Sequence, residues 1–85
     1  MNIKKILSSG SLKIKVKNEG MLQTHTLKIE KEISPFGPIP ILISELPLPE
    51  MELLRIAKET GLPIKRGNLR VFPPGKMPKD LANLL

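Results

Sequence analysis

Residues 47–75 constrain the fold most, because helix and hairpin signals follow one another there without conflict: PLPEMELLRIAKETGLPIKRGNLRVFPPG. Pro49 suits the first helical position, where its missing N–H is no loss. Apolar residues then recur with the helical period, and Gly61 followed by Pro63 is typical of a helix end. This stretch therefore predicts one main amphipathic helix over about 49–60.

A tight hairpin is predicted directly after this helix. Gly67-Asn68 separates two short runs of strand-forming residues, which is typical of a two-residue turn of the primed type. Such a turn places Lys65 opposite Arg70, and like charges opposite each other are destabilising. We expect this face, with Arg66 at the turn, either to be open to water or to hold an anion between the cations.

The same residues also resemble the helix-turn-helix motif of DNA-binding proteins, in the segment IAKETGLPIKRGNLRVF. Ala57 would lie inside the first helix and Gly61 at the turn. However, the second helix would contain Gly67 and Asn68 where an apolar contact belongs, and glycine costs roughly 1 kcal/mol relative to alanine in a helix. The hairpin is therefore the favoured interpretation.

A strand with one basic face is predicted over 11–17. Leu, Ile and Val alternate there with Lys13, Lys15 and Lys17, so one face is buried while the other presents three lysines. The lysines are interpreted either as a solvated surface or as contacts for an anionic partner.

A second strand is predicted over 21–33, after a loop at 17–20. This loop pairs Val16 with Met21 and leaves most apolar side chains on one face. His25 falls on the inward side, without a carboxylate or nucleophile nearby. A catalytic base needs a positioned partner, so a structural role is favoured for this histidine.

The middle of the chain is predicted to pass from a stiff loop into a buried strand. The loop covers 34–40, where three prolines and a glycine remove donors and favour extended geometry. The run 41–43 is continuously apolar, which fits a short strand buried on both faces.

The two ends of the chain carry weaker signals. Residues 2–8 fit either a strand or a short helix capped by Asn2, since so few positions do not define a period. Pro78 is suited to open a short helix over about 78–84. The terminal leucines suggest that this tail docks on its own domain or on a second copy.

Together these elements predict an α+β fold in one domain, residues 1–85. We expect a small antiparallel or mixed sheet of 4–5 strands, with the main helix packed on one face and a short C-terminal helix.

Amino-acid composition disfavours several kinds of functional site. The chain has no cysteine, one histidine and one aspartate, so we expect no disulfide, no metal site, no cofactor and no enzymatic activity. No apolar run approaches the roughly 18 residues of a membrane span, and the first residues do not resemble a signal peptide. We therefore expect a cytoplasmic protein without membrane contact.

Charge distribution leads to the first functional hypothesis. The net charge is +6, and the segments 1–18 and 61–79 contain bases but no acid. If these segments share a sheet face, that face is suited to a phosphate backbone, so we expect a nucleic acid or another polyanion as partner, with ribonucleoprotein association as an option. Two phenylalanines are the only aromatic residues, which disfavours base stacking. The candidate contacts are Lys13, Lys15, Lys17, Lys65, Arg66 and Arg70.

The alternative hypothesis is a homodimeric interaction or structural module without catalytic activity. The core is aliphatic and small, so self-association would add burial. The surfaces expected to pair are the apolar segment 39–48 and the C-terminal leucines.

Overall fold

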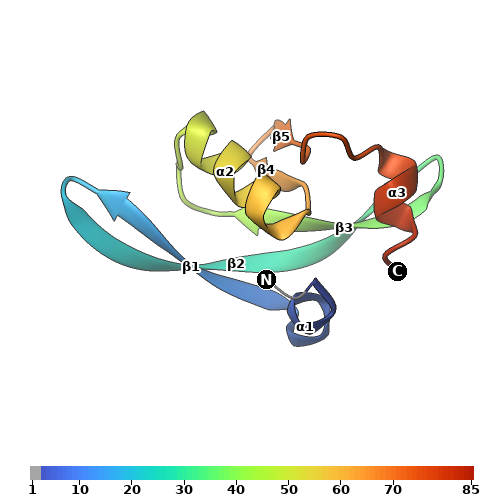
Figure 1. Cartoon of the computed structure of the whole chain (residues 1–85), viewed down its shortest axis with the longest axis horizontal. Helices are drawn as coiled ribbons and strands as arrows, with labels where there is room; N and C mark the ends of the chain where they lie inside the picture. The colour runs from blue at the N-terminus through green and yellow to red at the C-terminus, as the bar shows by residue number, and fades with distance from the viewer. Residues whose placement is uncertain (1–2) are drawn as a thin grey trace.

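A five-stranded mixed sheet organises the chain in the computed structural model, which describes residues 3–85 and, at Asn18, only the backbone (Figure 1). Neighbouring strands lie in the order β1-β2-β3-β4-β5. The predicted α+β class, with one main helix and a short C-terminal helix, is confirmed. The bounds are α1 Ile3–Ser9, β1 Ser11–Asn18, β2 Met21–Ser34, β3 Gly37–Ser44, α2 Glu50–Thr60, β4 Ile64–Arg66, β5 Leu69–Val71 and α3 Pro78–Ala82.

Helix α2 forms as its sequence signals predict. Pro49 differs slightly from the prediction, because it precedes the helix as the N-cap and its carbonyl accepts the first helical hydrogen bonds. Gly61 ends the helix in the left-handed region (φ 71°), and its N–H donates to Ala57 (2.8 Å). This helix joins β3 to β4, and those two strands are parallel, as such a crossover requires.

Arg55 lies on the outer side of α2 between two glutamates. Its guanidinium donates hydrogen bonds to Glu52 (2.6 Å) and Glu59 (3.0 Å), which lie three residues before it and four residues after it. The pKa of Arg55 is raised above its ordinary value, first by the Glu52 hydrogen bond, although partial burial acts in the opposite direction. These pairs support the helix along its exposed side.

Strand β3 begins earlier than expected. The prediction of a loop over 34–40 is wrong, because β3 runs through Pro38 and Pro40. The N–H of Leu42 donates to the carbonyl of Pro63 (2.8 Å), on the β4 side. The two prolines share the alternation of Leu42, so their nitrogens face that side, where β4 pairs only with the last three residues of β3. A missing donor there costs no ladder hydrogen bond, and pairing with β2 is complete.

The β4–β5 hairpin has the predicted register. Gly67 adopts a positive φ (58°) in a two-residue turn, and Lys65 lies opposite Arg70. Both segments are strands, so the helix-turn-helix interpretation is wrong. The glycine at the turn explains the outcome, because a two-residue hairpin favours it while a recognition helix does not.

The β1–β2 hairpin is tighter than predicted. Its turn contains only Glu19 and Gly20, both with positive φ, instead of the four-residue loop expected at 17–20. The register is therefore shifted by two residues, and Val16 faces Gln23 instead of Met21. A shift of two keeps every side chain on its predicted face.

The core lies between α1, α2 and one face of the sheet, which we call the inner face. Both helices contribute to it, α1 through Ile6 and α2 through Leu53, Ile56 and Ala57. The opposite, outer face carries the alternate residues of each strand. The inner-face members of the core are Ile14, Val16, Leu27, Leu42 and Ile64.

The ends of the chain pack on this sheet. The N-terminal segment is helical from Ile3, while its expected cap, Asn2, lies outside the described residues. Helix α3 contacts β3 and buries Leu81, so the tail docks on its own domain. The molecule measures 41 × 24 × 20 Å, because the β1–β2 hairpin extends as an arm beyond the helices (Figure 1).

Candidate functional site

A row of lysines lines the outer face of the hairpin arm. Lys13, Lys15 and Lys17, which we call the lysine row, are exposed on β1. Alternation along the strand explains the row, since every second residue points to the same face. Within the described part of the chain, no carboxylate lies within ion-pairing distance of the row. The row is therefore available to an anionic partner.

A second row, of two threonines, lies beside the lysines on β2. Thr26 pairs with Lys13 and Thr24 pairs with Lys15, and both threonines are exposed. Leu22 continues this row opposite Lys17 and is 71% exposed. The sequence alone does not single out these threonines, although their place opposite the lysines follows once the turn is known.

Acidic residues are nearly absent from this part of the sheet. Between residues 11 and 27 the only acid is Glu19, in the turn. Lys28, at the base of the arm, has an exposed partner in Glu45 (3.5 Å). An exposed pair of this kind is weak in water, so the outer face of the arm keeps its positive charge.

The predicted cationic pair on β4 and β5 has a partner within the protein. Lys65 and Arg70 lie on the same outer face as the lysine row, as the register requires. However, Arg70 donates through Nε to Glu32 Oε1 on β2 (2.7 Å), and Lys65 is half-buried. A carboxylate of the chain thus binds Arg70, one of the two cations between which the sequence predicts either water or an anion.

Arg66 lies apart from the other candidates. It falls on the inner face, opposite in alternation to Lys65, and its guanidinium donates to the carbonyl of Leu48. Arg66 therefore joins β4 to the segment that precedes α2. Of the six predicted contacts, the structure brings together the three of the lysine row, while β2 and β3 separate them from Lys65 and Arg70.

A small cavity lies on the inner side of the arm. It measures about 230 Å³, and its polar lining consists of Lys17, Gln23 and His25. The segment 46–49 forms its opposite wall. Neither a carboxylate nor a hydroxyl side chain lines it, so His25 has no partner there for proton transfer.

Residues 3–85 show neither a metal-binding cluster nor a membrane-spanning helix. Within 3–85, no three His, Cys, Asp or Glu side chains gather as metal ligands would. None of the helices described there is long and apolar enough to cross a membrane. Comparison of the chain with family models, curated proteins and solved structures finds no significant match.

The surfaces expected to pair two copies differ in exposure. Most of the apolar segment 39–48 is buried within the chain, and only residues 45–47 are exposed. The C-terminal leucines are more open, with Leu84 37% and Leu85 50% exposed. Ile33, near the opposite end of the molecule from the arm tip, is 90% exposed. A second copy would therefore find apolar surface at the α3 end.

Proposed function

We propose that this protein binds nucleic acid through the phosphate backbone, using the outer face of the hairpin arm. The observation that carries the proposal is the lysine row, which has no carboxylate partner within residues 3–85 and lies beside exposed threonines. Lysine and threonine side chains are common donors to phosphate oxygens, and such contacts do not depend on sequence.

The geometry of the strand supports repeated contacts along one backbone. Alternate residues of a strand lie roughly 6.6 Å apart, so the three ammonium groups form a line instead of a cluster. Each ammonium group that neutralises a phosphate releases condensed counterions, which makes binding salt-dependent. The net charge of +6 adds long-range attraction to the same partner.

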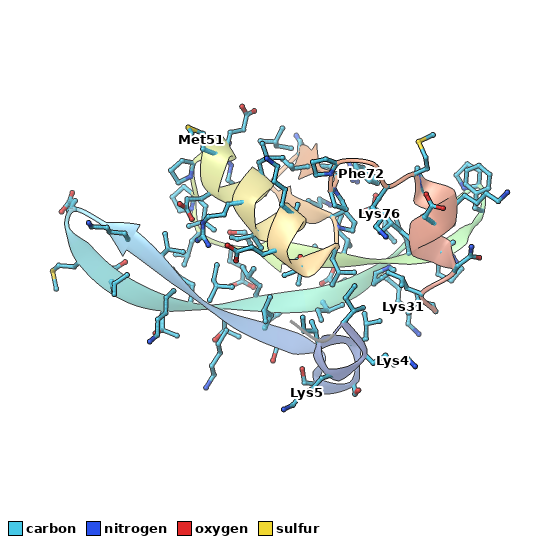
Figure 2. The ribbon with its side chains drawn as sticks, viewed as in Figure 1. Lys4, Lys5, Lys31, Met51, Phe72 and Lys76 are labelled. Atoms are coloured by element: carbon cyan, nitrogen blue, oxygen red, sulfur yellow. The ribbon has the colours of Figure 1, made fainter. Side chains whose placement is uncertain are left out.

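The aromatic residues lie away from this surface. Phe72 lies beside β5 near α2, and the turn that contains Phe36 lies at the end opposite the arm (Figures 1 and 2). Proteins that hold single strands without sequence preference usually stack bases on aromatic side chains. The arm offers none, so backbone contact is the mode of binding that we propose.

The test is a salt titration of binding by fluorescence anisotropy, with labelled DNA and RNA as probes. The variant K13Q/K15Q/K17Q removes the lysine row. We expect its slope of log K against log salt to be shallower than that of the wild type by about 2–3, since each phosphate contact contributes about 0.7–0.9. Its affinity at low salt falls accordingly.

A matched control removes the same charge elsewhere. The variant K58Q/K76Q/K79Q changes three exposed lysines, one on α2, one before α3 and one within α3, and Lys76 lies far from the arm (Figure 2). We expect it to keep most of the wild-type slope. Equal losses in the two variants would show that only net charge matters and would contradict a site on the arm.

A further inference from the structure

The hairpin arm is a two-stranded ribbon, open along both edges. β3 pairs with β2 only from Lys28 onward, so residues 21–27 of β2 have β1 as their single strand partner. β1 is the first strand in the sheet order and has no neighbour on its other side among the described residues. We call residues 11–18 and 21–27 the ribbon.

The direction of the backbone groups follows from one hydrogen bond at the base of the ribbon. The N–H of Ile29 donates to the carbonyl of Gly10 (3.1 Å), so these two residues face each other across the strands. Every second residue from these two likewise directs its N–H and C=O toward the partner strand. The residues between them direct their N–H and C=O away from the partner strand, toward the open edge. The residues whose N–H and C=O point to the open edges, which we call the outward set, are Lys13, Lys15 and Lys17 on β1 and Leu22, Thr24 and Thr26 on β2.

At both edges of the ribbon, the residues whose amides point to the open edge are therefore also the residues whose side chains lie on the outer face. Within residues 3–85, no further backbone hydrogen bond engages the amides of the β2 set. Backbone N–H groups contact phosphates in many protein–DNA complexes. A nucleic acid with phosphates on both sides of the ribbon would therefore engage both edges at once.

From this geometry we infer that the ribbon docks in the major groove of B-form DNA, with its outer face toward the base edges; this inference rests on the proposed function. The major groove is about 12 Å wide and accommodates a two-stranded β-ribbon. The backbones of two strands are about 4.8 Å apart, whereas five strands span about 19 Å. Only the ribbon part of the sheet therefore fits.

The side chains of the outer face match the chemistry of that groove. Lysine ammonium groups donate to phosphate oxygens, as in the proposed function, and also to the O6 and N7 acceptors of guanine, and threonine offers a hydroxyl and a methyl group. Leu22, near the tip, presents an apolar side chain to thymine methyl groups. The inner face is occupied by the core through Ile14 and Val16, so the outer face is the one that is free to enter.

The same geometry predicts discrimination between duplexes. The major groove of A-form RNA is deep and narrow, and side chains do not read it. We expect the protein to bind a B-form DNA duplex at least about tenfold more tightly than an RNA duplex of the same sequence at equal salt. Comparable affinities for the two duplexes would overturn the inference and leave the proposed backbone binding intact.

Dimethyl sulfate footprinting locates the groove directly. The reagent methylates N7 of guanine in the major groove and N3 of adenine in the minor groove. We expect protection of guanine N7 by the wild-type protein and by K58Q/K76Q/K79Q, and no protection by K13Q/K15Q/K17Q. Protection confined to adenine N3, or binding that protects neither atom, overturns the inference. Absence of salt-dependent binding to every probe overturns the proposed function as well.

Discussion

Glu19 adopts a backbone conformation that glutamate rarely takes. It is the first residue of the β1–β2 turn and has a φ of 51°, followed by Gly20 at 80°. Two positive φ values are typical of a type I′ turn, which matches the twist of the flanking strands and favours Asn-Gly. The tight turn sets the register of the ribbon, so the strain at Glu19 is a cost of that register.

Replacing this residue should stabilise the protein. We expect Glu19→Asn to raise the free energy of unfolding by roughly 0.5–1 kcal/mol, because asparagine tolerates the left-handed region better than glutamate. For a domain of this size the midpoint of thermal unfolding rises by about 2–8 °C. Glu19→Gln is the matched control, since it removes the same charge without relieving the backbone. Equal gains in both variants would indicate charge, not conformation, as the cause.

Among the strands, β5 is joined to β2 across two intervening strands by the Arg70–Glu32 pair. The two residues are 38 positions apart in the chain, and their side chains are 41% and 29% exposed. Glu32 also pairs across the ladder with the buried Ile39. The ion pair therefore lies on the outer face, next to a buried residue of β3.

A double-mutant cycle measures this link. With Glu32→Gln and Arg70→Met, we expect a coupling energy of about 0.5–1 kcal/mol in chemical denaturation at low salt, decreasing in 1 M salt. The Lys28–Glu45 pair is a suitable comparison, because its separation is 3.5 Å and both side chains are more than 60% exposed. Its coupling should lie near zero. A coupling at Glu32 no larger than this value would mean that the pair does not stabilise β5.

The elements that could be predicted from the sequence are those with local signals. The cap glycine of α2 and the Gly67 turn act within a few residues, and alternation alone places Lys13, Lys15 and Lys17 on one face. The start of β3 could not be predicted, because prolines are tolerated there only through the sheet geometry. Likewise, the partner of Arg70 depends on strand order, which no local pattern specifies.

For the whole molecule, the open ribbon predicts an alternating pattern of amide hydrogen exchange. We expect fast exchange at the outward amides of Lys13 and Lys15 and slow exchange at the inward amides of Ile14 and Val16. The measurement is residue-resolved exchange by NMR. Slow exchange along the whole of β1 would instead reveal a second copy paired at this edge. We expect no such pairing, because an antiparallel second β1 would set the lysine rows directly against each other.

Pro38 and Pro40 also bear on how this protein avoids aggregation. An extended strand with free donors is a template on which identical chains add to form fibrils. Along the half of β3 that β4 does not cover, the two prolines remove the donors that such growth needs. At the β1 edge of the ribbon, the like charges of the lysine row oppose the addition of an antiparallel second copy. A chain with alanine at both prolines should therefore form fibrils more readily, even where its fold is unchanged.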